Sequence, residues 1–326
     1  MIHRLLAAAA AFALVLPAAA EQAPPAGPSP GEIVAAAPAS EWIAIAPSDL
    51  LVMDVAPDVK GKPRRVVIQL MPAPFSQGWI DNIRKLAAAH WWDGTSINRV
   101  QDNYVVQWGD ATEKKPLPEG LGAVPESEYV AVTKGTGGQV PSDGKTPGMF
   151  WSGYAPGWAW SDQFDAYAKK YSFFRGWPFG SNDGRSGWPV HCYGMVGVGR
   201  NLSPDTGSGA ELYTVIGHAP RHLDRNIALV GRVIEGIEHL SSLRRGTGAL
   251  GFYETEVERV PIVSIRLGTQ LREAEQPRFE YLSTESDSFA RYADARANRR
   301  DPFFIKPAGG ADICNVPVPV RRIAAK

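Results

Sequence analysis

Short apolar runs separated by turn-forming residues dominate the centre of the chain. Residues 50–55 (LLVMDV) and 65–70 (RVVIQL) are rich in apolar and β-branched side chains, and a segment containing Pro, Gly and Lys separates them. This pattern predicts two antiparallel strands joined as a hairpin. Similar strand-like runs occur at residues 95–100, 104–108, 194–199, 211–216, 227–233, 257–260 and 262–267.

Two segments show helical periodicity instead. From Ser76, a residue type that caps helices, to Ala89, apolar residues recur at the spacing of one helix face. A second helix is expected over residues 234–243, ahead of Gly246. About eight strands with only two core helices predict a mainly β fold. We expect a closed eight-stranded antiparallel barrel whose ends are capped by the helices.

The first twenty residues have the pattern of a secretory signal peptide. A basic start precedes an apolar run over residues 5–16, and residues 18–20 provide an A-x-A end. We expect cleavage after Ala20, which would place the mature protein in the periplasm or outside the cell. The Pro/Ala-rich residues 21–45 predict a flexible leader. No later segment reaches the length of a membrane span, so stable membrane insertion is not expected.

An insertion rich in Gly, Pro and aromatic residues occupies residues 111–190. An irregular stretch of this length is usually functional or packs with its own side chains. It is therefore either a lid or extra peptide-binding surface, or a small core that holds a long loop, and we favour the small core. Its tryptophans are Trp151, Trp158, Trp160, Trp177 and Trp188.

The composition changes again after residue 268. Residues 269–326 are expected to form a C-terminal extension, with a charged amphipathic helix over residues 284–300. An extended tail follows, which we expect Phe303 and Phe304 to pin to the body of the protein.

Composition and charge indicate a globular protein and argue against a nucleic-acid partner. The 326-residue chain is 44% hydrophobic and 21% charged, as expected for a globular protein with a core. Its 34 Lys and Arg residues are balanced by 34 Asp and Glu residues. Such a chain produces no global field that would attract nucleic acid, so no nucleic-acid partner is expected.

The chain contains two cysteines, Cys192 and Cys314. In an oxidising compartment they would form one disulfide that clamps the C-terminal tail to the body of the protein; the alternative is two unpaired buried thiols. The sequence leaves both open, because it does not show whether the two Cα atoms come within reach. Since no Cys/His spacing pattern accompanies the pair, no metal site is expected.

Three blocks of sequence carry a family resemblance. WWDGTSINRVQDNYVVQWGD (residues 91–110) resembles the cyclophilin signature Y-D-G-T-x-F-H-R-V-x-x-x-F-x-x-Q-G-G-D in order and spacing. HCYGMVGVGR (191–200) and HLDRNIALVGRVIEGIEHLSSLRRG (222–246) are similar to two later blocks of the same family. The resemblance spans residues 46–268, which we therefore expect to form a cyclophilin-like isomerase domain.

The resemblance implies a peptidyl-prolyl cis–trans isomerase. Rotation about an X-Pro bond has an uncatalysed barrier of about 18–20 kcal/mol but breaks no bond, so no cofactor is expected. A guanidinium that donates to the twisted amide lowers this barrier, and Arg99 stands at the catalytic position. The resemblance assigns substrate binding to Tyr104, Gln107, Gly199, Glu211, Tyr213, His222 and Leu223.

Departures from the family pattern leave two functions open. Glu211 stands where the family often has glutamine, His222 replaces a tryptophan of many members, Ile227 a histidine and Val230 a phenylalanine. One hypothesis is an isomerase that assists the folding of proline-containing exported polypeptides. The alternative is a catalytically weak cyclophilin-like chaperone or peptide-binding protein that holds partners through its Trp-rich insertion. The sequence does not indicate the oligomeric state.

Overall fold

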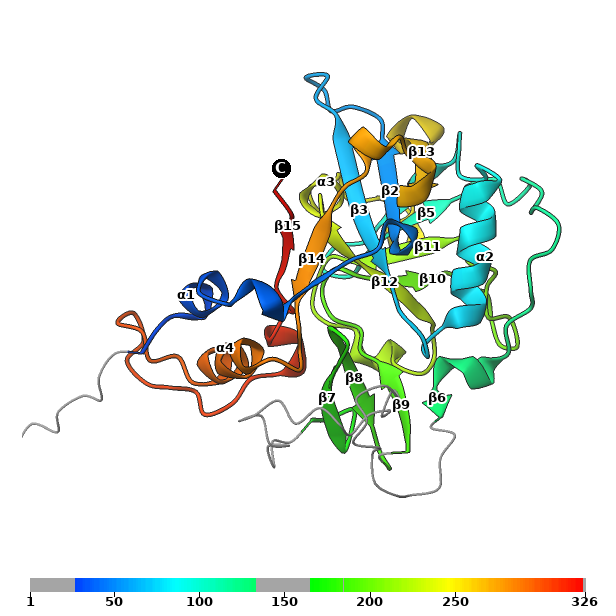
Figure 1. Ribbon diagram of the computed structural model, residues 1–326. Helices are drawn as coiled ribbons and strands as arrows, with labels where there is room; N and C mark the ends of the chain where they lie inside the picture. Colours follow the sequence, from blue (N-terminus) through cyan, green and yellow to red (C-terminus); the bar gives the residue numbers. More distant parts are fainter. Residues whose placement is uncertain (1–26, 133–164, 184, 325–326) are drawn as a thin grey trace, which may run out of the picture.

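Eight antiparallel strands close into a barrel, as predicted (Figure 1). The computed structural model describes residues 27–132, 165–183 and 185–324. Around the barrel the strand order is β10-β11-β5-β4-β13-β2-β3-β12. The strands are β2 (Leu50–Val55), β3 (Arg64–Leu70), β4 (Ser96–Val100), β5 (Val105–Gly109), β10 (Met195–Val198), β11 (Leu212–Val215), β12 (Leu229–Glu235) and β13 (Val260–Leu267). The run expected at 262–267 lies in β13. The separate strand expected at 257–260 is wrong, because Glu256–Glu258 form a 3-10 helix and only Val260 belongs to β13.

Two helices were expected on the barrel, and they differ in how well the sequence predicted them. Helix α2 (Gln77–Ala88) follows the prediction, contacts β12 and β13, and buries Trp79, Ile80 and Ile83 in the core. Ser76 occupies the N-cap position, but its side chain makes no capping hydrogen bond. Helix α3 is only Glu238–Ser241, shorter than the predicted 234–243. The helix begins late because β12 continues to Glu235 and the next residue, a glycine, has a positive φ of 82°.

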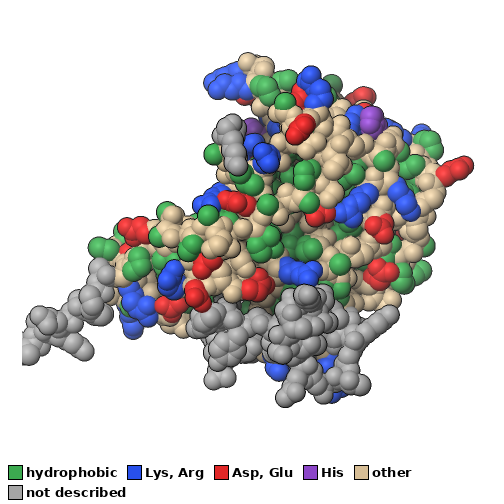
Figure 2. Space-filling model, in the orientation of Figure 1, with side chains coloured by type: hydrophobic (Ala, Val, Ile, Leu, Met, Phe, Trp, Pro, Cys, Tyr) green, Lys and Arg blue, Asp and Glu red, His purple; other side chains and the backbone are tan. Residues whose placement is uncertain are grey.

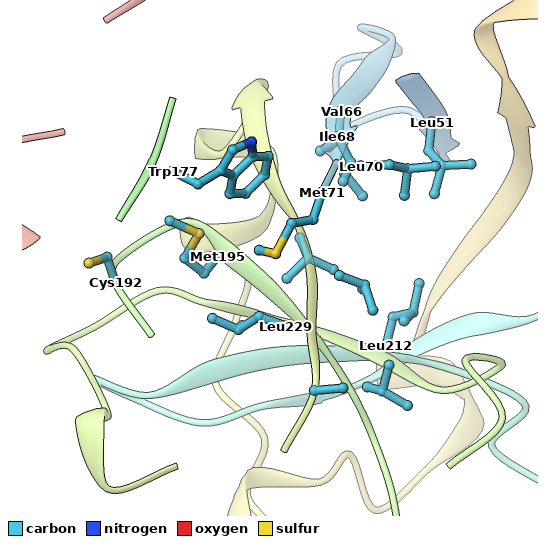
Figure 3. Close-up of a cluster of buried hydrophobic side chains, with 14 of the residues drawn as sticks. Leu51, Val66, Ile68, Leu70, Met71, Trp177, Cys192, Met195, Leu212 and Leu229 are labelled. Atoms are coloured by element: carbon cyan, nitrogen blue, oxygen red, sulfur yellow. The ribbon is translucent and has the colours of Figure 1, made fainter. Parts of the chain in front are cut away.

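Apolar side chains from strands around the barrel fill its interior. Leu51, Ile68 and Leu212 are almost completely buried and point into one continuous cluster (Figure 3). Strands β2 and β3 are buried on their outer face as well, where Leu50 and Val67 pack in a second cluster with Phe279 and Tyr281. Burial on both faces explains why these strands read as apolar runs and not as strict alternation.

The outer face of β2 and β3 is covered by the two ends of the chain. Strand β1 (Trp42–Ala44) pairs with β14 (Phe279–Leu282), which pairs with β15 (Val320–Arg322). Helix α1 (Pro30–Ala35) packs against α4 (Asp287–Ala297) (Figure 1). This three-stranded sheet joins segments about 240 residues apart in sequence.

The flexible leader predicted for residues 21–45 is wrong for the part that the structure describes, residues 27–45. Ser29 and Glu32 form a capping box at the start of α1. Ile33 and Trp42 are buried against the C-terminal extension. The Pro/Ala-rich composition hides these few anchoring residues, because their partners lie at the other end of the chain.

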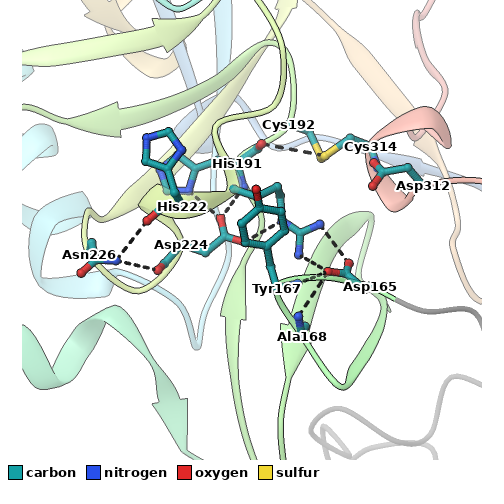
Figure 4. Close-up of polar contacts among 11 residues, drawn as sticks. Asp165, Tyr167, Ala168, His191, Cys192, His222, Asp224, Asn226, Asp312 and Cys314 are labelled. Atoms are coloured by element: carbon teal, nitrogen blue, oxygen red, sulfur yellow. Dashed lines mark hydrogen bonds and ion pairs between the residues drawn. A yellow bond between two sulfur atoms is a disulfide. The ribbon is translucent and has the colours of Figure 1, made fainter.

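The C-terminal extension contains the expected helix, but other residues attach its tail. Phe303 is 84% exposed and Phe304 is 38% exposed, so the prediction that they pin the tail is wrong. The tail is held by the buried Ile313 and by a disulfide between Cys192 and Cys314, whose Cα atoms lie 5.1 Å apart (Figure 4). The structure thus selects the disulfide over two free thiols.

The insertion forms a sheet where the sequence suggested an irregular stretch. Its strands are β6 (Ala131–Val132), β7 (Lys170–Phe174), β8 (Trp177–Ser181) and β9 (Ser186–Pro189), in the order β6-β9-β8-β7. Trp177 and Trp188 are buried, Trp177 within the main core cluster, which removes these two rings from any client-binding surface. The prediction for Trp151, Trp158 and Trp160 falls outside the described residues.

Short 3-10 helices connect many of these elements. They are η1 (Ala39–Glu41), η2 (Pro47–Asp49), η3 (Glu126–Tyr129), η4 (Arg221–Leu223), η5 (Ala249–Gly251), η6 (Glu256–Glu258), η7 (Gly268–Gln270), η8 (Glu273–Glu275) and η9 (Ile313–Asn315). Acidic and basic side chains are interspersed over the face shown in Figure 2, in keeping with the balanced composition. Within the described ranges, no helix combines the length and apolarity that crossing a membrane requires.

Candidate active site

A groove with a volume of about 740 Å³ runs across the strands β4, β5 and β11 and past Gly199, the residue after β10. Seven of the eight side chains and backbone positions singled out from the sequence line it. These are Arg99, Tyr104, Gln107, Gly199, Glu211, Tyr213 and Leu223. The barrel therefore brings together positions that are up to 124 residues apart in the chain (99 to 223).

Strand register places Arg99 beside Gln107. The two residues are paired across β4 and β5, next to a register shift between Ile97 and Arg99. Residues paired in this way project to the same face of a sheet, so both side chains reach the groove. Arg99 Nη1 donates to Gln107 Oε1 at 3.2 Å.

Two further contacts complete the hold on the Arg99 guanidinium. Its Nε donates to the backbone oxygen of Leu250 at 2.7 Å, and its Nη2 donates to Gln101 Oε1. The guanidinium carbon lies 5.7 Å from the centre of the Tyr104 ring and 5.3 Å from that of Phe252. Partial burial lowers the pKa of Arg99 from its ordinary value, but an arginine stays charged at neutral pH.

Two residues that hold Arg99, Leu250 and Phe252, lie in the loop after α3 and were not predicted from the sequence. Phe252 forms an isolated antiparallel bridge with Arg99, and Leu250 supplies the carbonyl described above. Both lie in a glycine-rich segment without apolar periodicity, so no pattern marked them. Proximity to Arg99 is a tertiary property that a single sequence does not reveal.

An apolar pocket lies next to the guanidinium. Val105 and Tyr213 are buried in one cluster, against which Tyr104 and Ile227 pack. Leu223 also lines the groove. Such a group of aromatic and aliphatic side chains is suited to bury the ring of a proline residue.

His222 is the one predicted site residue outside the lining of the groove. It is exposed, and its ring is nearly parallel to that of Tyr104, with centroids 6.4 Å apart. Its neighbours in the 3-10 helix η4 differ, since Arg221 is buried and Leu223 faces the groove. His222 therefore lies beside the ring of Tyr104, and its contact with substrate stays a prediction.

Glu211 contributes an unusual carboxyl group to the groove. Its Oε1 accepts the backbone N–H of Asp110 at 2.7 Å, and it packs so closely on Gly109 that a Cβ there would lie 1.9 Å from Oε1. Burial raises the pKa of Glu211 to about 7, while hydrogen bonds from Asp110, Asn98 and Gln107 act in the opposite direction. The carboxyl group therefore titrates near neutral pH.

Two other polar groups of the groove were not singled out from the sequence. Asn98 Oδ1 and Arg259 Nε are buried, line the groove and have no hydrogen-bond partner within the part of the chain that the structure describes. Buried polar atoms without a partner are uncommon in folded proteins. Neither atom is accessible to solvent in this conformation, although both residues line the groove.

An apolar pocket beside a fixed guanidinium, on a closed eight-stranded barrel, is suited to hold a proline ring with a donor next to its amide. The sequence matches the family described as "Cyclophilin type peptidyl-prolyl cis-trans isomerase/CLD" over residues 64–267. The match covers more than half of the chain, and the protein belongs to this family. It is accordingly a peptidyl-prolyl cis–trans isomerase.

A solved structure with a TM-score above 0.5 shares the fold. Cyclophilin AquaCyp293 from Hirschia baltica is 22% identical and superimposes with a TM-score of 0.63, over 87% of this chain and 94% of that one. A cyclophilin-type isomerase from Cryptosporidium parvum, crystallised in the presence of the dipeptide Ala-Pro, is 10% identical with a TM-score of 0.37, over 66% of this chain and 98% of that one. No curated protein shows significant sequence similarity to this chain.

The raised pKa of Glu211 predicts a pH-dependent stability. The pKa of this carboxyl group rises from 4.5 in the unfolded chain to about 7 in the fold, so its burial does not lower the unfolding free energy below pH 4.5, where both states are protonated. Stability is lost as the pH rises from about 4.5 to about 7, because the unfolded chain ionises in this range while the folded carboxyl group, poorly solvated when charged, keeps its proton. The full effect is about 3 kcal/mol at most. Relative to Glu211→Gln, the wild type should lose about 2–3 kcal/mol of unfolding free energy between pH 5 and pH 8.

Urea denaturation at a series of pH values measures this difference. Glu273→Gln, a change at an exposed glutamate, is the matched control and should follow the wild type at every pH. A stability difference between Glu211→Gln and wild type that stays constant from pH 5 to pH 8 would show that Glu211 does not titrate in this range.

Proposed function

We propose that this isomerase acts on proline-containing polypeptides exported from the cytoplasm, and that X-Pro bonds rotate in the groove beside Arg99. The single observation that carries the proposed site is the guanidinium of Arg99, fixed at the edge of a pocket formed by Tyr104 and Tyr213. The exported setting is supported by the signal-peptide pattern of residues 1–20. It is also supported by the Cys192–Cys314 disulfide, since such bonds persist in oxidising compartments.

The proposed mechanism requires the groove to prefer the twisted amide over both planar forms. Rotation breaks the resonance of the X-Pro bond, and the prolyl nitrogen then gains a lone pair. The Arg99 guanidinium donates to this region, while the pocket grips the proline ring. Because the donated bond is stronger in the twisted state, it lowers the barrier and does not merely tighten binding.

Gln107 has two roles in this scheme. Its Oε1 accepts from Arg99 and so orients the guanidinium. Its Nε2 lies on the side of Gly199, 3.5 Å from the position that a Cβ at Gly199 would take. One N–H of this nitrogen donates to Glu211, and the other can donate to the backbone of a peptide that passes over Gly199, which has no side chain to block the approach.

Replacing Arg99 should abolish most of the activity. Losing one preorganised donor to a transition state typically costs about 10²–10³-fold in rate. We expect Arg99→Ala to lower kcat/KM for a proline-containing tetrapeptide by about 100-fold. Arg99→Lys should recover little, because an ammonium does not reproduce the fork of donors that contacts Gln107, Gln101 and Leu250.

The control is Arg84→Ala, which removes an arginine of α2 that pairs with Asp49 away from the groove. Its kcat/KM should equal that of the wild type. An Arg99→Ala variant that accelerates relaxation as well as the Arg84→Ala variant would refute the proposed site.

The exported setting predicts a processed N-terminus. When the full chain is expressed in a bacterium with a secretion system, the protein should be recovered from the periplasm or medium with Glu21 as its first residue. N-terminal sequencing of the fractions measures this. Recovery of a chain that still begins at Met1, confined to the cytoplasm, would contradict export but leave the isomerase assignment intact.

A further inference from the structure

A continuous line of buried polar groups lies behind the pocket and is not used in the mechanism above. The ring of Tyr213 lines the groove, and its hydroxyl group lies 2.8 Å from His191 Nε2. His191 Nδ1 lies 2.8 Å from Asp224 Oδ1 (Figure 4). His191 is 0% exposed, Asp224 is 4% exposed and Tyr213 is 5% exposed, so the three groups are shielded from water.

The chemistry of the three groups fixes where the protons lie. An ionised Asp224 only accepts hydrogen bonds, so His191 carries its proton on Nδ1 and donates it. Burial lowers the pKa of His191 and raises that of Tyr213, so the imidazole is neutral and the phenol keeps its proton. His191 Nε2 is therefore an acceptor, and the Tyr213 hydroxyl group donates to it.

The carboxylate of Asp224 accepts two further hydrogen bonds besides the one from His191 Nδ1. Asp224 Oδ1 also accepts the backbone N–H of His191 at 3.0 Å, and its Oδ2 accepts from Arg221 Nε at 2.7 Å. Arg221 in turn forms a bidentate pair with Asp165 of the insertion, at 2.9 and 3.2 Å. Since Arg221 and Asp224 flank Leu223, the same network also fixes a wall of the pocket.

Without His191 as its acceptor, the Tyr213 hydroxyl group would have no hydrogen-bond partner at its present position. It occupies space that Gly197 leaves open, because a Cβ there would lie 2.3 Å from the oxygen. Leaving a buried hydroxyl group without a hydrogen-bond partner costs folding free energy. The hydroxyl group could reach solvent only by turning toward the adjacent groove. A reoriented phenol would bring its polar end into the site of the proline ring.

We propose that His191 and Asp224 are positioning residues of this isomerase. They hold the Tyr213 hydroxyl group beneath the pocket, so that only the face of its ring meets the substrate proline. The inference rests on the proposed site beside Arg99. Because the pocket grips the proline ring in planar and twisted states alike, loss of positioning acts on KM and leaves kcat nearly unchanged.

The test compares His191→Phe in two backgrounds, with a proline-containing tetrapeptide as substrate. In the Tyr213 background the change leaves a buried hydroxyl group unpartnered, and we expect KM to rise about tenfold with kcat within about twofold. In the Tyr213→Phe background there is no hydroxyl group to misplace, and adding His191→Phe should leave KM unchanged. His191→Gln, whose amide can both accept and donate, should retain a KM close to the wild type.

Two kinetic results would overturn the proposal. One is a KM that does not change in His191→Phe, even if its melting temperature falls, since that describes a purely structural role. The other is an equal rise of KM in both backgrounds, since the effect would then not pass through the hydroxyl group. A wild type that fails to accelerate isomerisation would instead contradict the proposed function.

A measurement on the wild type covers the case in which His191→Phe does not fold. Nitrogen-15 NMR of the imidazole should show Nδ1 protonated and Nε2 unprotonated and accepting a hydrogen bond, with the Nε2 signal shifted in Tyr213→Phe. A proton on Nε2, or an Nε2 signal that does not respond to Tyr213→Phe, would exclude the hydrogen bond that Tyr213 donates to His191, on which the proposal depends.

Discussion

The chemistry of this protein depends on a guanidinium that is held in place without being neutralised. Arg99 donates to the amide oxygens of Gln107 and Gln101 and to the backbone carbonyl of Leu250, all of which are uncharged acceptors. A carboxylate in their place would hold the side chain as firmly, but it would also cancel much of the charge that the twisted amide requires. Partial burial between the Tyr104 and Phe252 rings strengthens the remaining field.

The barrel serves this arrangement through register. Pairing of β4 with β5 sets Arg99 beside Gln107, and pairing of β5 with β11 sets Gln107 beside Tyr213. Departures from the family pattern are accommodated locally. The carboxyl group of Glu211, which stands where the family often has glutamine, accepts the Asp110 N–H and occupies the space above Gly109. The Tyr213 hydroxyl group is likewise paired, with His191, and occupies the space above Gly197. The polar groups of Glu211 and Tyr213 are thus both hydrogen-bonded within the pocket.

The sequence predicted well what depends on local pattern and poorly what depends on distant contacts. Arg99, Tyr104 and Gln107 lie within one contiguous strand–turn–strand segment with a recognisable spacing, and the structure places all three in the groove. The strand β1 and helix α1 were missed because their partners lie in the C-terminal extension. The disulfide was left open for the same reason, since its cysteines are 122 residues apart.

The account would be tested most directly by locating a bound proline while its peptide bond rotates. In NMR spectra of a proline-containing tetrapeptide mixed with the protein, exchange cross-peaks should connect the cis and trans forms. Nuclear Overhauser effects should join the proline ring to the Tyr104 and Tyr213 rings. Exchange that occurs with the proline located elsewhere, or a proline in this pocket with no exchange above the uncatalysed rate, would contradict the assignment of catalysis to the groove beside Arg99.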